Sequence, residues 1–277
     1  MEFDIGRLVA GSIMVDKLVS VIIPFYKEIH LVARAVESAI TQELPLGWKL
    51  EIVVGNDGSF SAEEIVGACG HLNAEMKVIK NHDANGAGNA RNAAIKASHG
   101  SVLAFLDADD YWLPGKLNAQ LAMISKGLNF TATGYQFRGT DTIVTPPESV
   151  KSAYQFFRQL SVGTSTVVVA KSLLSDQLFS NLRFSQDTEF WARLFSSRPV
   201  VFGSTSSIFT IYEPSGRTAN KAVQFFRFRD VVQMFKFRAL QRFVIYTSYT
   251  LRGIGNHFLK ARFGRAVRTF DSIVGRS

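Results

Sequence analysis

The chain has 277 residues, of which 47% are hydrophobic and 19% charged, and its formal net charge is +8. This length and balance predict a globular protein with one large domain, or with one domain and an appendage, and they exclude disordered and collagen-like chains. The single cysteine, Cys69, excludes a disulfide framework, and the five scattered histidines do not have the spacing of a structural zinc site. These features favour a reducing, cytoplasmic setting.

The two ends of the chain differ in character. Near the N-terminus Arg7 precedes an apolar run of about eight residues, but acids precede the arginine and Asp16 closes the run, so we expect 1–17 to be a lead-in segment instead of a signal peptide. The sequence has no apolar window of about 18 to 20 residues, so we expect no transmembrane helix. At the other end, residues 221–277 contain twelve Lys and Arg and two acids, a net charge of +10.

Strand-like and helix-like stretches alternate through the first half of the chain. This alternation predicts βαβ units and an α/β fold, with a mostly parallel central sheet and helices on both faces. Ser61 and Glu64 have the spacing of a capping box at the start of a helix. We expect strands at 18–26, 49–55, 76–81 and 101–107, and helices at 28–41, 61–72, 86–100 and 114–127.

The pattern is looser in the second half. We expect short strands at 128–137, 141–145, 165–170, 200–204 and 208–212, and helices at 148–160 and 186–196. A change in composition near 215–220 begins a basic, phenylalanine-rich tail. We therefore expect a domain over 18–215 and a helical extension over 216–277.

Polar residues follow each of the four strands of the first half, and in a parallel sheet such strand ends share the edge where ligands bind. Asp107, Asp109 and Asp110 follow the apolar run 102–106. The i, i+2 spacing lets Asp107 and Asp109 approach one divalent cation, Mn²⁺ or Mg²⁺. The alternative is that Asp110 or a neighbour caps the following helix, although three acids in four residues exceed what a cap needs.

Two other strand ends allow both a functional and a structural interpretation. Asp57 can present its carboxylate to a ligand or form an Asx turn. The stretch "NGAGNARN" resembles a glycine-rich dinucleotide turn, but Arg91 replaces the third glycine, which disfavours a dinucleotide site. Its small residues can bring a helix N-terminus close to a ligand, with Arg91 pairing to a diphosphate, or they can serve close helix packing with Arg91 exposed.

Asp187 and Trp191 are four residues apart and so lie on one helical face. In a sugar site the carboxylate would take a hydroxyl proton while the aromatic ring stacks on the sugar. Periodicity alone favours the simpler interpretation, in which Asp187 complements the helix dipole and Trp191 belongs to the core.

Together these motifs resemble a known family. The stretches "VSVIIPFYKE", "VVGNDGS", "GAGNARNAAIKASHGSVLAFLDADDYWLPGKL" and "FSQDTEFWARL" occur in the order found in family 2 glycosyltransferases of the bacterial polysaccharide-synthesis type. The resemblance covers about 18–215. It implies the GT-A fold, a Rossmann-like arrangement in which 18–115 bind the nucleotide sugar and 116–215 bind the acceptor.

The resemblance implies roles for five donor-binding residues. Pro24, Tyr26 and Glu28 match the loop that lies against the nucleoside. Asp57 matches the aspartate that meets the base. Arg91 matches the residue near the base and the phosphates.

It implies the reacting groups as well. Asp107 and Asp109 match the D-x-D pair, the first near the ribose and the second on the divalent ion that bridges the diphosphate. Asp187 matches the general base of inverting members. The chain departs from the family pattern at Gln186, where a glutamate is usual.

A second departure lies in the late loop that folds over the donor. A histidine or another basic residue is expected there, but "IYEPSGRTANK" offers Glu213 and Arg217. We take Arg217 as the candidate for closing over the donor.

The sequence thus predicts a metal-dependent, inverting hexosyltransferase that moves a sugar, most simply from a UDP-sugar, to a glycan or lipid-linked acceptor of a bacterial surface polysaccharide or exopolysaccharide. The alternatives are a non-catalytic nucleotide-binding protein and a membrane-associated scaffold.

The basic aromatic tail favours an anionic membrane surface as a partner, at the inner face of the cell membrane. No base-reading motif accompanies the charge, so we expect no nucleic-acid partner. The alternative is a helical cover packed on the domain, with snorkelling arginines.

Overall fold

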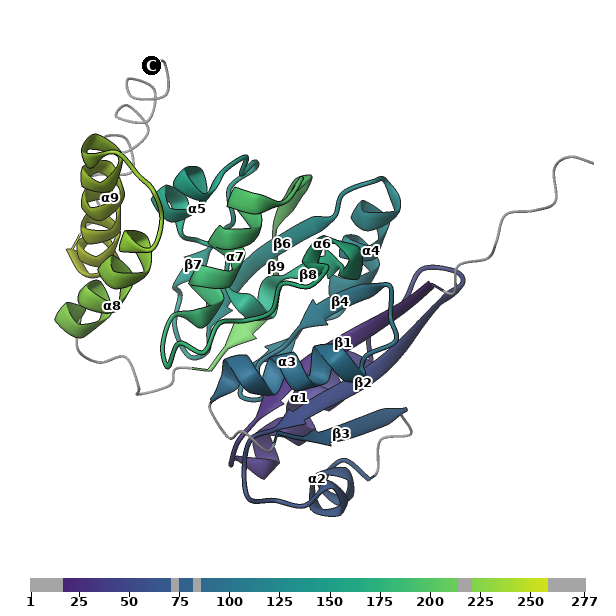
Figure 1. The fold of residues 1–277 in the computed structure, drawn as a ribbon. Coiled ribbons are helices and arrows are strands. Elements are labelled where there is room, and N and C mark those ends of the chain that lie inside the picture. Colours follow the sequence, from purple (N-terminus) through teal and green to yellow (C-terminus); the bar gives the residue numbers. More distant parts are fainter. Residues whose placement is uncertain (1–16, 71–74, 82–85, 214–220, 259–277) are drawn as a thin grey trace, which may run out of the picture.

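The computed structural model describes residues 17–70, 75–81, 86–213 and 221–258 (Figure 1). These residues form one mixed sheet with helices on both faces, and a pair of helices follows at the C-terminal end of the described chain. The lead-in segment up to residue 16 and Arg217 lie outside the described residues. The division at residue 115 and the domain boundaries stay predictions.

The first half of the chain forms the parallel part of the sheet. Strands β1, β2, β3 and β4 pair in the order β3-β2-β1-β4, and every pairing is parallel. Their carboxyl ends therefore meet at one edge, as the alternation predicted. The strands are β1 (Lys17–Phe25), β2 (Trp48–Asn56), β3 (Met76–Lys80) and β4 (Val102–Phe105), and the helices between them are α1 (Ile29–Ile40), α2 (Ala62–Ala68) and α3 (Ala87–Ala97).

The second half extends the sheet beyond β4 with mixed pairing. The order continues β8-β6-β9-β5, β7 pairs with β6, and only β6 and β9 are parallel in this part. The α/β class is confirmed, with its parallel strands concentrated in the first half. The elements are β5 (Tyr111–Trp112), α4 (Lys116–Ser125), β6 (Phe130–Phe137), β7 (Ile143–Val144), α5 (Ala153–Gln159), β8 (Val168–Ala170), α6 (Lys171–Leu174), α7 (Gln186–Ser197) and β9 (Phe202–Tyr212).

Several boundaries differ from the expected ones. The strand expected over 165–170 begins only at Val168, because residues 164–166 form a 3-10 turn. The two strands expected at 200–204 and 208–212 form one strand, β9, which shifts register opposite Gly134. The helix expected from 148 begins at Ala153, because the Ser152 hydroxyl accepts the N–H of Gln155 and caps it.

The two faces of the sheet build separate cores. Val21 and Ile23 of β1 belong to the cluster under α1, α2 and α4, whereas Ile22 belongs to the cluster under α3, α5 and α7. Successive side chains of a strand point to opposite faces of the sheet, and here both faces are covered by helices. The apolar run of β1 is continuous for that reason.

The tail forms α8 (Lys221–Gln233) and α9 (Ala239–Phe258), which lie beside α5 (Figure 1). Phe157 of α5 meets Phe228, Phe235 and Phe237 at ring-centroid distances of 5.9, 5.0 and 5.8 Å. One side of the helical pair is thus the packed cover that the sequence left open as an alternative.

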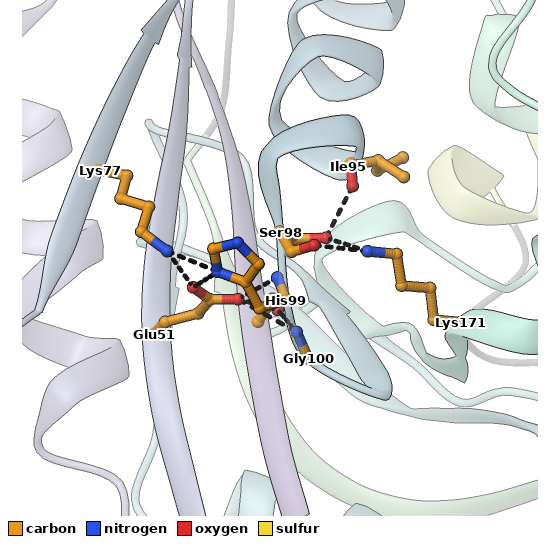
Figure 2. Close-up of polar contacts among 8 residues, drawn as sticks. Glu51, Lys77, Ile95, Ser98, His99, Gly100 and Lys171 are labelled. Carbon is orange, nitrogen blue, oxygen red and sulfur yellow. Dashed lines mark hydrogen bonds and ion pairs between the residues drawn. The ribbon is translucent and has the colours of Figure 1, made fainter. Parts of the chain in front are cut away.

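A cluster of polar residues lies near the amino ends of the parallel strands, at the edge opposite to their carboxyl ends. Figure 2 shows Glu51 of β2 with Lys77, His99 and Gly100 around it. The carboxylate accepts the Ser20 hydroxyl at 2.6 Å, the His99 N–H at 2.6 Å, the Gly100 N–H at 3.1 Å and the Lys77 ammonium at 2.9 Å. It thereby ties three strands to the turn before β4.

Candidate active site

The carboxylate of Asp57 joins the loops after β2 and β3. It accepts the side-chain amide of Asn81 at 2.7 Å and the backbone N–H of Gly86 at 2.8 Å. The Asx turn that the sequence offered as an alternative is made by its neighbour instead, because Asn56 Oδ1 accepts the N–H of Gly58 at 3.0 Å. Asp57 is therefore fixed at the edge where the parallel strands end.

The loop after β1 lies against the same place. Pro24 is buried in β1, and the Tyr26 side chain is 56% exposed. A Cβ on Gly58 would lie 1.6 Å from the Tyr26 carbonyl oxygen, so only glycine allows the two loops to touch. Glu28 occupies the N-cap position of α1, and its carboxylate lies 3.5 Å from the Lys27 ammonium.

Arg91 of α3 is 4% exposed and reaches the acidic turn after β4. Its Nη2 donates to Asp107 Oδ1 at 2.5 Å, and its guanidinium lies 5.3 Å from the Phe179 ring centroid. Burial lowers the pKa of Arg91, but the charges of Asp107 and Asp187 outweigh burial and raise it. Nε and Nη1 have no hydrogen-bond partner within the described residues. The exposed-arginine interpretation is therefore wrong.

The small residues around Arg91 serve packing. A Cβ on Gly88 would lie 3.1 Å from Gln186 Cγ, and one on Gly55 would lie 2.0 Å from the Ala90 carbonyl oxygen. Gly86 at the N-cap has φ +94°, which favours glycine. Glycine thus lets α3 press against β2 and α7, which places Arg91 between the acidic turn and Asp187.

The three acids after β4 have different surroundings. Asp107 and Asp109 are half-buried, while Asp110 is 2% exposed. Asp110 accepts the Ser165 hydroxyl at 2.6 Å and the Glu213 N–H at 3.0 Å. Burial, and then the charges of Asp107 and Asp109, raise the pKa of Asp110 well above its usual value.

The alternative role of Asp110 as a helix cap is wrong. The N-cap residue of α4 is Gly115, and its φ of +88° lies in the left-handed region. Asp110 holds the acidic turn in place instead.

Asp187 lies in the first turn of α7. Its Oδ2 accepts the Thr164 hydroxyl at 3.0 Å, and its Oδ1 accepts the Thr188 N–H at 2.7 Å. Trp191 on the same helix is 1% exposed, and its ring packs against Phe105 at a centroid distance of 5.1 Å. Trp191 therefore belongs to the core and offers no surface for a sugar, while Asp187 is held beside Arg91.

The residues of this edge fit a divalent cation that the substrate helps to hold. The charges of Asp107 and Asp187 act on the buried guanidinium of Arg91, and those of Asp107 and Asp109 act on Asp110. No group of three or more Asp, Glu, His or Cys side chains in residues 17–70, 75–81, 86–213 and 221–258 could hold a metal ion by itself. Mg²⁺ in nucleotide sites usually takes one or two carboxylates together with phosphate oxygens and water. Asp109 can supply such a carboxylate.

Three residues of this region escaped the sequence analysis. Arg34 of α1 donates to the Asp109 carbonyl oxygen at 2.6 Å, Ser165 contacts Asp110, and Thr164 contacts Asp187. Each is 23 to 75 residues away from its partner. No local spacing could indicate such pairs.

Comparison with known proteins agrees with this geometry. Residues 20–180, more than half of the chain, match the model of the family described as glycosyl transferase family 2. The UDP-Glc:alpha-D-GlcNAc-diphosphoundecaprenol beta-1,3-glucosyltransferase WfgD of Escherichia coli is 27% identical over 258 residues, which are 91% of this chain and 100% of that protein.

Solved structures share the fold. S. aureus TarS 1-349 in complex with UDP-GlcNAc has a TM-score of 0.59 at 18% identity, over 86% of this chain and 72% of that one. The mannosyltransferase PcManGT from Pyrobaculum calidifontis, in complex with GDP-Man and Mn²⁺, has a TM-score of 0.58 at 13% identity, over 87% and 70%. The GT-A fold is confirmed, and the chain belongs to glycosyl transferase family 2 and is a glycosyltransferase.

Proposed function

We propose that this enzyme transfers a hexose from a UDP-sugar to a lipid-linked acceptor, with inversion and with a divalent cation, during assembly of a bacterial surface polysaccharide. The observation that carries the proposal is the position of Arg91, buried between Asp107 and Asp187 with two donor groups facing no partner in the described residues. WfgD, named for UDP-glucose and a diphosphoundecaprenol-linked acceptor, matches along its whole length and supports the same substrate classes.

The donor side of the reaction follows from the fixed groups. Asp57 keeps lone pairs for the N–H of a base, because each carboxylate oxygen accepts more than one hydrogen bond. The Nε and Nη1 groups of Arg91 would donate to diphosphate oxygens. This binding would remove the free-energy cost of leaving these buried donors unpaired. Asp109 would hold the cation, which when bound neutralises charge on the leaving diphosphate.

The acceptor side depends on Asp187. Thr164 and Thr188 fix its two oxygens, which leaves lone pairs to take the proton of the acceptor hydroxyl. The acceptor oxygen then bonds to the anomeric carbon as the bond from that carbon to the phosphate oxygen breaks. The proton ends on Asp187 and the electron pair on the diphosphate. A single displacement inverts the anomeric configuration.

The decisive experiment separates binding from chemistry. We expect Asp187→Asn to lower sugar transfer by about 10²- to 10⁴-fold while calorimetry with Mn²⁺ shows unchanged UDP binding, because the lost group is a general base. We expect Asp109→Ala to weaken Mn²⁺-dependent UDP binding by at least about tenfold.

Asp141→Asn is the matched control, since Asp141 is exposed in the turn before β7. It should bind UDP and transfer sugar like the wild type. Transfer at the wild-type rate by Asp187→Asn would remove Asp187 from the mechanism, and metal-independent UDP binding would remove Asp109.

We propose that the tail keeps the enzyme on an anionic membrane at the cytoplasmic face. Residues 221–258 contain seven Lys and Arg and one acid. The outer side of the helical pair exposes large apolar side chains, of which Leu240, Phe243 and Leu251 share one stripe of α9. Such a surface suits an interfacial helix. None of the helices in the described part of the chain has the length and apolar character to cross a bilayer.

Vesicle flotation tests this surface. We expect the double variant Leu240→Ser, Phe243→Ser to lose most binding to phosphatidylglycerol-rich vesicles while its melting temperature stays unchanged, because Phe243 is 66% exposed. Leu46→Ser, at an exposed leucine far from the tail, is the control. If the double variant floats with vesicles like the wild type, the tail surface is not the membrane contact.

A further inference from the structure

The acidic turn is held by three residues from other parts of the chain, through its backbone at Asp107 and Asp109 and through the carboxylate of Asp110. The Asp107 N–H donates to Ser165 Oγ at 3.1 Å, and the same hydroxyl donates to Asp110. Arg34 donates to the carbonyl oxygen of Asp109. The backbone N–H of Glu213 donates to the other oxygen of Asp110. The turn that presents the D-x-D pair is therefore supported on both sides.

Glu213 is the point where these supports meet. Its Oε2 accepts Arg34 Nη2 at 2.9 Å and Arg138 Nη1 at 2.9 Å. These hydrogen bonds, from Arg138 first and Arg34 next, lower the pKa of Glu213 below its usual value. The guanidinium of Arg34 also lies 4.8 Å from the ring centroid of Tyr111, the residue after the acids. Arg34 thus contacts the turn from α1. Glu213, which directly follows β9, accepts Arg34 with its carboxylate and donates its backbone N–H to Asp110.

We propose that Glu213 is a positioning residue: it fixes Arg34 on the acidic turn, so that Asp107 and Asp109 are already placed when the donor and its cation arrive. The inference rests on the proposed function. Three neighbouring carboxylates repel one another, and that repulsion favours a looser turn whenever no cation is bound. Fixing the turn beforehand removes the cost of ordering it on binding, and so strengthens donor binding.

A merely structural ion pair would behave differently. Glu213 is 26% exposed and Arg138 is 54% exposed, and ion pairs with such access to water contribute little to stability. The backbone N–H that binds Asp110 remains whatever side chain stands at 213. Removing the carboxylate should therefore leave the fold intact and act on the turn through Arg34 alone.

The test measures stability and donor binding in the same variants. For Glu213→Ala we expect Mn²⁺-dependent UDP binding by calorimetry to weaken about tenfold and KM for the donor to rise similarly, with kcat within about twofold. The melting temperature should stay at the wild-type value. Glu213→Gln, which keeps an acceptor oxygen for an arginine, should lie between Glu213→Ala and the wild type.

Arg34→Ala gives an independent check on the route. The double variant Arg34→Ala, Glu213→Ala should bind UDP no more weakly than Arg34→Ala alone, since both changes remove one support. Asp176→Ala is the matched control, because it deletes another surface ion pair, with Arg198 at 2.6 Å. That control should bind UDP like the wild type.

The outcomes separate the two proposals. Unchanged UDP binding in Glu213→Ala, beside metal-dependent binding in the wild type, overturns the positioning role and leaves the proposed function standing. A fall in kcat with KM unchanged also overturns it. If the wild type binds no UDP with Mn²⁺ present, the proposed function fails and the positioning role fails with it.

Discussion

Two carboxylates with the same exposure, Glu51 and Asp110 at 2% each, have pKa values shifted in opposite directions. Burial raises the pKa of Glu51, but hydrogen bonds from Ser20, His99, Lys77 and Gly100 outweigh it and lower the pKa to about 2. Asp110 is buried beside two acids, and the hydrogen bonds from Ser165 and Glu213 do not outweigh these effects, so its pKa rises. The number and charge of the surrounding donors decide the direction of the shift.

Glu51 should therefore stabilise the fold in a pH-dependent way. Its pKa falls from 4.5 to about 2 on folding, which corresponds to about 3 kcal/mol. Because the folded pKa is the lower one, this contribution is complete above pH 4.5 and is lost as the pH falls toward 2. We expect Glu51→Gln to lower the free energy of unfolding by about 3 kcal/mol at pH 7, in urea titrations.

The difference between wild type and Glu51→Gln should shrink as the titration is repeated from pH 5 down to pH 3. The exposed Glu148→Gln serves as the control and should track the wild type at every pH. A constant difference across that range would mean that Glu51 contributes by packing and not by its charge.

At the scale of elements, the contact between α3 and β2 depends on glycine. A Cβ on Gly55 would lie 2.0 Å from the carbonyl oxygen of Ala90, which is backbone and cannot rotate away. We expect Gly55→Ala to lower the free energy of unfolding by at least about 2 kcal/mol and to weaken UDP binding, since α3 carries Arg91.

Gly67→Ala is the matched control, because Gly67 lies in α2 and has no atom within 4 Å of an added Cβ. It should leave stability unchanged or raise it by up to about 1 kcal/mol, as alanine favours helix. Equal stability of the two variants in urea would show that α3 can shift without cost.

The boundaries of some elements could not be predicted from sequence patterns. The parallel strands were predictable because both of their faces are buried, so their apolar runs are continuous. β9 was predicted as two strands, 200–204 and 208–212, but pairing with β6 across a register shift keeps it continuous. β5 is two residues long and is formed by pairing with β9, a contact about 100 residues away in the chain.

At the scale of the whole molecule, the tail is joined to the α/β domain through Phe157. This side chain is fully buried and touches three phenylalanines of the segment 221–237. We expect Phe157→Ala to cost about 3 to 5 kcal/mol and to expose the helical pair to limited proteolysis near residue 220. Phe243→Ala, at an exposed ring of α9, should change neither stability nor cleavage.

An outcome in which Phe157→Ala destabilises the protein without faster cleavage of the tail would show that the helical pair is held by other contacts. Tyr154 of α5, whose ring lies 6.3 Å from that of Phe237, would then be the next residue to replace.

The residues of the candidate site that directly follow a strand were predictable from the sequence. Asp57, Asp107 and Asp109 follow apolar strands, and the pairing of those strands confirms that their ends share an edge. Their roles toward a donor and a cation stay predictions. Trp191 shows the limit of spacing, because its position beside Asp187 on the helix suited either a sugar or the core, and only its neighbours decided for the core.

The sequence by itself determined the α/β class, the parallel half of the sheet and the family, because hydrophobic periodicity and motif order are local properties of the chain. The tertiary structure alone decided which side of the tail is buried, and that Arg91 is enclosed between two carboxylates. It alone showed that Arg34, Ser165 and Glu213 support the acidic turn, because they meet it across 55 to 103 residues of chain, and contacts over such distances exist only once the sheet has brought the segments together.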